Sequence, residues 1–269
     1  MSFFFSSDRR FTYSDSLPYP HGFSTREGGV SAIPHLASLN LGYGRGDEKE
    51  TVEENYRRFF HSVFGKAALS RRAISDQIHS DILHYAPTGG KYPEGDGFYT
   101  DREDVILTVR MADCVPILFA EPKNRLIAAV HAGWRGTVKG IAAKAVDAIL
   151  SMGGKKEEIL VAVGQAIGSC CYEVGEDFMK TVADLRGTAF TGAHIQAREG
   201  RLYADVVGMN LAILSEAGVR EDRIALSGYC TACDTGSFFS HRASGGQRGT
   251  MAAAIMLPSE KKQAFITKP

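Results

Sequence analysis

The sequence predicts an α/β fold in which the β-sheets mix parallel and antiparallel strands. Short β-rich runs alternate with segments whose apolar residues recur at helical spacing. One pair of runs is joined by a hairpin-type turn, EPKN at 121–124, whereas other runs are separated by a whole helix. No tandem repeat or Pro/Ser-rich linker divides the chain, so we expect one domain over residues 1–269.

The elements are expected in the following order. The first fifth of the chain is loop-rich, with short extended pieces between glycine turns. A helix over 47–64 follows, because its apolar residues fall on one helical face. The later expected strands are 73–80, 81–86, 104–110, 115–120, 125–131, 158–164, 224–228 and 250–257, and the later expected helices are 138–150, 175–184 and 205–217.

The composition excludes several classes of protein. Hydrophobic residues make up 44% of the chain, and Lys plus Arg equal Asp plus Glu at 31 each. This balance provides no global field for nucleic acid or a membrane surface. The N-terminus lacks a signal-peptide core, and no apolar run approaches the roughly 18 residues of a membrane span. Five cysteines are too few for a disulfide scaffold. We expect a reduced cytoplasmic protein, a monomer or a small homo-oligomer.

Unusual polar residues lie where predicted strands end. Gln77 and His79 close one run, Asp113 and Cys114 lie between two others, and His131 ends a third. If these ends share one rim, His79, Cys114 and His131 offer two imidazole nitrogens and a thiolate, a set that suits zinc. Three protein ligands leave a coordination position for water or substrate. The alternative is that Cys114 is a buried small hydrophobe and that both histidines are ordinary hydrogen-bonded residues.

Four arginines lie beside glycines: Arg26, Arg135, Arg242 and Arg248. Arginine forms bidentate contacts with phosphate or carboxylate, and neighbouring glycines let ligand oxygens approach the backbone. Arg135 and Gly136 are also expected to precede a helix, whose first N–H groups favour an anion. The alternative, favoured for Arg248, is that these arginines pair with surface carboxylates.

The remaining cysteines are Cys170 and Cys171, which are adjacent, and Cys230 and Cys233, which form one C-x-x-C pair. A four-cysteine zinc site requires a second closely spaced pair, and adjacent cysteines are an awkward one. We therefore expect structural packing for all four. P-loop, dinucleotide-binding and G-x-S-x-G motifs are absent from the sequence.

Seven segments together resemble the YfiH/laccase-domain family, also labelled polyphenol oxidase or DUF152. They span roughly residues 21 to 257, and Gln165, Ser169 and His241 depart from the usual family pattern. In chain order the segments are HGFSTREGGVS, SLNLG, the Gln77-x-His79 pair, ADCVPIL, VHAGWRGT, GSCCYEVG and FFSHRASGG.

The resemblance implies a single α/β domain of stacked mixed β-sheets flanked by helices, similar to the catalytic domains of cytotoxic necrotizing factors. It implies a metal triad at His79, Cys114 and His131, with zinc as cofactor and copper possible at the same site. The family is described as purine nucleoside phosphorylases acting on adenosine, inosine and methylthioadenosine, with an accompanying adenosine deaminase activity. The expected partners are therefore a purine nucleoside and phosphate.

On this hypothesis Arg135, Arg26 or Arg242 would hold phosphate near the ribose C1′. Gln77 and Asn40 would bind ribose hydroxyls or the base edge, and Asp113 would orient a metal ligand or carry a proton.

Three other functions stay open at this point. One is a metal-independent cysteine hydrolase or amidase acting on cell-wall precursors, with Cys114 as the nucleophile. Another is a zinc-stabilised nucleoside sensor without catalysis. The last is a copper-dependent polyphenol oxidase, although none of the eight histidines forms the His-x-His pairs of multicopper oxidases.

Overall fold

Two large β-sheets form the centre of the computed structural model, which describes residues 1–65 and 68–259. The seven-stranded sheet has the order β1-β2-β3-β16-β8-β4-β6, and the six-stranded sheet has the order β15-β11-β9-β10-β7-β5. The strands of the first are β1 (Phe3–Phe5), β2 (Phe11–Ser14), β3 (His21–Ser24), β16 (Met251–Met256), β8 (Ile106–Met111), β4 (Arg72–Ser75) and β6 (Gly90–Tyr92). Those of the second are β15 (Ile224–Leu226), β11 (Leu160–Val163), β9 (Val115–Glu121), β10 (Leu126–Ala132), β7 (Gly97–Thr100) and β5 (Leu83–Tyr85).

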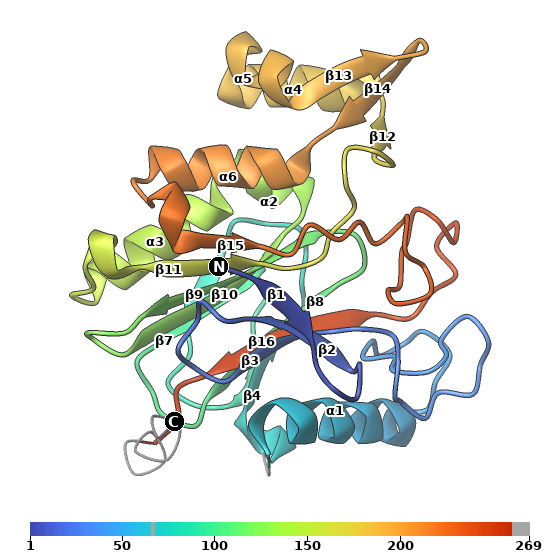
Figure 1. Ribbon diagram of the computed structural model, residues 1–269, viewed down its shortest axis with the longest axis vertical. Coiled ribbons are helices and arrows are strands. Elements are labelled where there is room, and N and C mark those ends of the chain that lie inside the picture. The colour runs from blue at the N-terminus through green and yellow to red at the C-terminus, as the bar shows by residue number, and fades with distance from the viewer. Residues whose placement is uncertain (66–67, 260–269) are drawn as a thin grey trace.

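The sheets are stacked between layers of helix (Figure 1). Alternate residues of β9 face opposite sides of the six-stranded sheet, as the pleat of a strand requires. Leu118 belongs to the core that also contains Phe23 and Val109 of the other sheet. Its neighbour Phe119 packs instead in the core that contains residues of α3 (Ile141–Ser151) and α6 (Val206–Glu216). The β9 strand is therefore buried on both faces.

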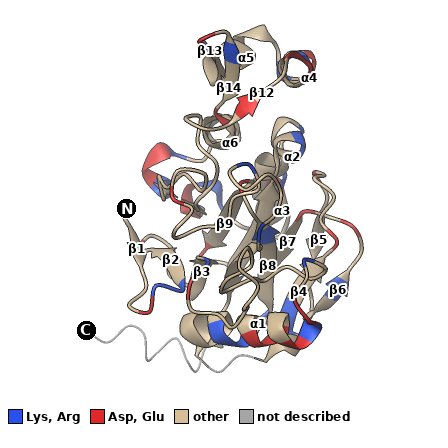
Figure 2. Cartoon of the chain, turned by 90° about the vertical axis from the view of Figure 1, so that its right-hand side faces the viewer, with Lys and Arg blue, Asp and Glu red and all other residues tan. Residues whose placement is uncertain are grey.

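Helix α1 (Lys49–Phe64) covers the outer face of the seven-stranded sheet (Figure 1). It buries Tyr56 and Phe59 against residues of β16 and β8. Acidic and basic residues both lie along this helix (Figure 2). Their side chains form i,i+4 ion pairs on its exposed face. Such exposed pairs contribute only about 0.5 kcal/mol each. This helix therefore presents no surface of a single charge sign.

A smaller lobe stands at one end of the molecule, beyond α6 (Figure 1). We define the lobe as β12 (Glu173–Val174), α4 (Glu176–Arg186), α5 (Thr188–His194), β13 (Ile195–Arg198) and β14 (Arg201–Ala204). Its strands form a third sheet of order β12-β14-β13. The sequence predicted only α4 here, because the lobe strands are short and largely exposed and so lack a clear period-2 pattern.

The predicted fold class is confirmed, with mixed sheets and flanking helices. The helix expected over 47–64 is α1, and residues 121–124 join β9 to β10 as an antiparallel hairpin. The helix expected over 138–150 is α3 (Ile141–Ser151), but it begins three residues later than expected, because α2 (Trp134–Val138) ends before Gly140, whose φ of 84° separates the two helices. The strand expected over 73–80 ends at Ser75, and residues 77–80 form a loop.

The described residues also contain three short 3₁₀ turns, at Leu69–Arg71, Lys156–Glu158 and Glu221–Arg223. Within the described residues, no helix is long and apolar enough to cross a membrane.

The buried His21 predicts a specific loss of stability in acid. Its Nδ1 lies 2.7 Å from the Tyr19 carbonyl oxygen, and its Nε2 accepts the Ser14 backbone N–H at 3.1 Å. This pairing requires a neutral ring, and burial, opposed only weakly by the Tyr19 hydrogen bond, lowers the pKa of His21 to about 4. Since the unfolded chain binds this proton near pH 6.5, stability falls as pH drops from 6.5 towards 4.

From pH 7.5 to pH 5 the loss attributable to His21 is expected to be roughly 2 kcal/mol. Urea unfolding of wild type and His21→Gln at the two pH values measures it, with exposed His61→Gln as the control. Equal pH dependence in wild type and His21→Gln would show that His21 is not the responsible group.

Candidate metal centre and its cavity

Three strand connections bring the predicted ligands together. Cys114 lies immediately before β9, in a turn where Asp113 adopts a φ of 88°. His131 lies near the end of β10, opposite Pro116 of the antiparallel neighbour β9. His79 enters from the loop after β4 with a φ of 59°. Positive φ values at non-glycine residues cost energy and concentrate at functional sites, so this local geometry favours a functional role.

The donor atoms of His79, Cys114 and His131 all lie within 4.8 Å of one another. The two imidazole rings meet edge to face, with centroids 5.0 Å apart. Gly133 permits this packing, because a Cβ there would lie 2.7 Å from Cδ2 of His79. The convergence predicted from the sequence is therefore present, and the donor set of two nitrogens and one sulfur suits zinc.

A residue that the sequence analysis missed, Asp96, organises this site. It is fully buried, and its Oδ1 lies 2.8 Å from Nδ1 of His131. Its carboxylate also accepts the backbone N–H groups of Ile78, His79 and Ser80. Asp96 thus fixes the ring of one candidate ligand and the backbone of another, a role typical of carboxylates behind metal-bound histidines. The signal available in the sequence was a carboxylate between two glycines directly before a strand.

The titratable groups of the site depend on one another. Burial raises the pKa of Cys114, but His131 and His79 outweigh it and lower that pKa to about 6. Burial lowers the pKa of His131, yet Cys114 and Asp96 raise it to about 9. Burial raises the pKa of Asp96, and hydrogen bonds from His131 and Ser80 bring it down to about 2. Cys114 and Asp96 thus both favour the charged form of His131, and His131 favours the charged forms of both.

The triad lies at the junction of two cavities. The larger, of about 550 Å³, has an apolar and aromatic wall that includes Trp134 and Tyr172. The smaller, of about 190 Å³, is lined by all three triad residues and is mainly polar. His79 and Cys114 line both cavities, and so do Arg45 and Arg248. A ligand in one cavity is therefore adjacent to a ligand in the other.

Three of the four arginines named from the sequence, Arg135, Arg242 and Arg248, line the larger cavity, whereas Arg26 does not. The exposed Arg135 stacks on Trp134, its guanidinium carbon 4.3 Å from the ring centroid. Arg135 had been expected to precede a helix, but it lies inside α2, which has only five residues. Arg242 reaches the carbonyl oxygen of Glu173. Arg26 lies in a separate cavity, where it donates to the carbonyl oxygens of Ala37 and Thr235.

Arg248, which the sequence analysis expected to pair with surface carboxylates, lies inside the site. It donates to the hydroxyl oxygen of Thr250 at 2.8 Å. Its Nε is buried and has no hydrogen-bond partner within the described part of the chain. Burial and the neighbouring Arg45 lower its pKa to about 10, so it stays charged at neutral pH. Two cations side by side in a polar cavity favour an anionic ligand.

The other predicted residues are already engaged by the protein. Asn40 is fully buried and holds the backbone of Gly42 and Thr250. The Gln77 carboxamide lines the smaller cavity but pairs with both backbone groups of Arg110. Asp113 accepts hydrogen bonds from the Thr231 hydroxyl and the Arg242 backbone N–H. It therefore positions the loop that carries Arg242, whereas Asp96 orients the histidine.

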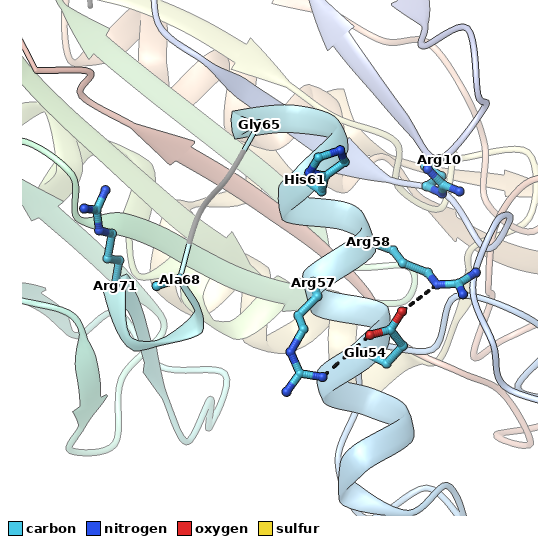
Figure 3. A pocket seen from close by; sticks show the side chains of 8 residues that line it. All are labelled: Arg10, Glu54, Arg57, Arg58, His61, Gly65, Ala68 and Arg71. Atoms are coloured by element: carbon cyan, nitrogen blue, oxygen red, sulfur yellow. Dashed lines mark hydrogen bonds and ion pairs between the residues drawn. The ribbon is translucent and has the colours of Figure 1, made fainter. Parts of the chain in front are cut away.

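Another cavity, with a volume of about 720 Å³, lies beside α1 and is separate from the two cavities at the triad. Two of its arginines, Arg57 and Arg58, are paired with Glu54 (Figure 3). The triad residues do not line it. The cavity beside α1 has the greater volume, but the candidate metal ligands line the two cavities that meet at Cys114. The functional site is therefore assigned to those two cavities.

Fold and site together define an α/β protein with a His-Cys-His centre inside a cationic cavity, and three comparisons agree. The family model described as multi-copper polyphenol oxidoreductase laccase matches residues 20–258, so the chain belongs to this family. A purine nucleoside phosphorylase of Deinococcus radiodurans is 40% identical over 248 residues, covering 92% of this chain and 93% of that protein. The crystal structure of YlmD from Geobacillus stearothermophilus is similar with a TM-score of 0.85 and 31% identity, covering 96% of this chain and 100% of that one.

The curated YlmD protein of Geobacillus stearothermophilus is also named a purine nucleoside phosphorylase. It is 36% identical to this chain over 248 residues, covering 87% of this chain and 88% of that protein. The expected family is thus confirmed. Among the described residues, one group of three or more potential metal ligands contains histidine, namely His79, Cys114 and His131.

Proposed function

We propose that this protein cleaves purine nucleosides with inorganic phosphate, releasing the free base and ribose 1-phosphate. Adenosine, inosine and methylthioadenosine are the proposed substrates, and deamination of adenosine is proposed as a second activity of the same site. The observation that supports this best is the junction of an aromatic cavity and a cationic cavity at one candidate metal centre. The names of the relatives agree with it.

The residues present fit zinc. Two nitrogens and one thiolate form an open three-ligand set, and the Asp96 contact to Nδ1 leaves Nε2 of His131 as the free donor. When bound, zinc would polarise a substrate atom or lower the pKa of a water molecule towards neutrality, which deamination at the purine C6 requires.

The two cavities suggest where each substrate binds. The purine would lie in the larger cavity against Trp134 and Tyr172, since aromatic walls suit a flat base. Phosphate would lie in the smaller cavity beside Arg45 and Arg248. The ribose would then span the junction at Cys114, with C1′ exposed to the phosphate. Positioning of this kind, with the charge of the arginines, supplies a large part of the catalysis.

Arg248→Ala is expected to raise the KM for phosphate by about 10- to 100-fold, because one charge-assisted hydrogen bond is worth about 1.5–3 kcal/mol. The KM for inosine should change much less. Steady-state kinetics with each substrate varied in turn measures both, with Arg57→Ala on α1 as the control. A larger effect of Arg135→Ala on the phosphate KM would place phosphate on the Trp134 side instead.

A metal-independent cysteine hydrolase is the second candidate, since Cys114, His131 and Asp96 also form a nucleophile–base–carboxylate arrangement.

The first experiment is phosphate-dependent release of base from adenosine and inosine, before and after metal removal and after zinc is restored. Release that requires phosphate and zinc supports the phosphorylase. Ammonia without base leaves only the deaminase, and turnover of neither nucleoside favours the hydrolase.

A further inference from the structure

Four cysteines that line neither of the two cavities at the triad lie together in the structure. Their Sγ atoms are all within 4.8 Å of one another, although the sequence places them as an adjacent pair and a distant C-x-x-C pair. The sequence predicted structural packing for all four. Their exposure argues against packing in a core, since Cys170 and Cys233 are exposed and Cys171 and Cys230 are only half-buried.

The parallel pairing of β11 with β15 brings the two pairs together. The chain segments after these strands continue side by side, as the bridge between Ala166 and Cys230 shows. A turn then carries Cys170 and Cys171, with the Cys171 N–H donating to the carbonyl oxygen of Gly168. The turn directs two adjacent side chains to one side, which removes the objection to neighbouring cysteines.

The distances fit a single tetrahedral ion. Zinc–sulfur bonds of about 2.3 Å place the sulfurs of a regular tetrahedron about 3.8 Å apart. Sγ of Cys233 lies 3.5 Å from that of Cys170 and 3.4 Å from that of Cys171. These two distances are slightly shorter than the tetrahedral value, and the other sulfur–sulfur distances do not exceed 4.8 Å.

The surroundings of Cys230 also suit a metal thiolate. Its Sγ accepts the backbone N–H of Gly168 at 3.2 Å, and the N–H groups of Ala232 and Cys233 are directed to it as well. Several N–H donors on one sulfur stabilise negative charge there, as they do around metal-bound cysteines. A neutral thiol used only for packing has no need of three donors.

We propose that Cys170, Cys171, Cys230 and Cys233 form a second, structural zinc site, closed by four thiolates. Four sulfurs in a tetrahedral arrangement suit zinc. Because all four ligands come from the protein, the ion would have no free position for substrate. The site joins the segment that enters the lobe to the loop before β16. Tyr172 directly follows one ligand and lines the larger cavity, and Thr231 directly follows another and binds Asp113. The ion therefore fixes one wall of the catalytic cavity.

The decisive test leaves the four cysteines intact. Of the two candidate metal sites among the described residues, the triple variant His79→Ala, Cys114→Ala, His131→Ala keeps only the four-cysteine one. Purified under a phosphine reductant, this variant is expected to retain about one zinc per chain, against about two in wild type. X-ray absorption at the zinc edge should show four sulfurs at about 2.3 Å and no nitrogen.

Adding Cys171→Ser and Cys233→Ser to the triple variant should remove that zinc. A folded triple variant that binds no zinc after incubation with the metal, and whose four thiols all react with a thiol reagent, would overturn the proposal. So would a stable disulfide among the four in the reduced preparation. Because the triple variant is inactive on either proposed mechanism, this result is independent of whether the protein is a phosphorylase.

Discussion

Replacing Cys114 by alanine is expected to lower the rate of phosphorolysis by about three orders of magnitude, equivalent to about 4 kcal/mol of transition-state stabilisation. Cys114 supplies the only sulfur of the triad and lies at the junction of both cavities. Its loss removes one of three ligands and with it the metal of an open site. Metal analysis should show one zinc fewer per chain, and nucleoside assays at saturating phosphate should show the loss of rate.

Two further variants separate this result from loss of a nucleophile or of the fold. Cys114→Asp provides a carboxylate oxygen, which zinc accepts, but no thiol. On the zinc hypothesis it should regain part of the zinc and part of the rate. A cysteine hydrolase would lose all activity in both Cys114 variants, whatever their metal content. His84→Ala, on β5 and outside the triad, should keep wild-type zinc and rate.

The triad was predictable because each ligand follows or ends a strand, and the pairing of β9 with β10 brings two strand ends to one rim. Asp96 was not predictable in the same way. Its partners lie 16 to 35 positions away in the sequence, and nothing local distinguishes a buried orienting carboxylate from one in an exposed turn. The sequence identified the candidate ligands, whereas Asp96, which fixes their orientation, emerged only from the fold.

The binding roles expected for Arg26 and Asn40 do not match the structure, for a related reason. Glycines beside Arg26 and Asn40 mark turns, and turns serve backbone packing as readily as ligand binding. Both side chains are used internally, by Ala37 and Thr235 for Arg26 and by Gly42 and Thr250 for Asn40. Arg248 has the same glycine-rich context but lies in the cavity with an unpartnered Nε. Arg248 therefore differs from Arg26 and Asn40 only in how its side chain is buried and in which groups it hydrogen-bonds.

The four-cysteine cluster shows the same limit. Its two pairs are about 60 residues apart in the sequence, and their proximity depends on β15 lying next to β11. A one-strand change in sheet order would separate them. Strand order is a property of the whole sheet, and the sequence analysis predicted the strands without their order.

Asp96→Asn is expected to weaken zinc binding at the triad by about 10- to 100-fold and to lower the rate correspondingly. The carboxylate accepts from Nδ1 of His131 and from three successive backbone N–H groups, including that of His79. An amide has only one acceptor atom, so its NH₂ must face a donor. Either the tautomer of His131 changes or the loop carrying His79 loses hydrogen bonds.

Zinc affinity measured by competition with a chromophoric chelator tests this prediction, and it is best read beside Asp101→Asn. Asp101 follows the other end of β7, is exposed, and accepts from the Tyr85 hydroxyl rather than from a ligand. The two variants make the same chemical change at opposite ends of one strand. Weaker zinc binding in Asp96→Asn alone shows that the fold acts on the metal through His131 and the His79 loop. Unchanged affinity in Asp96→Asn would mean that the three ligands hold their geometry without that carboxylate.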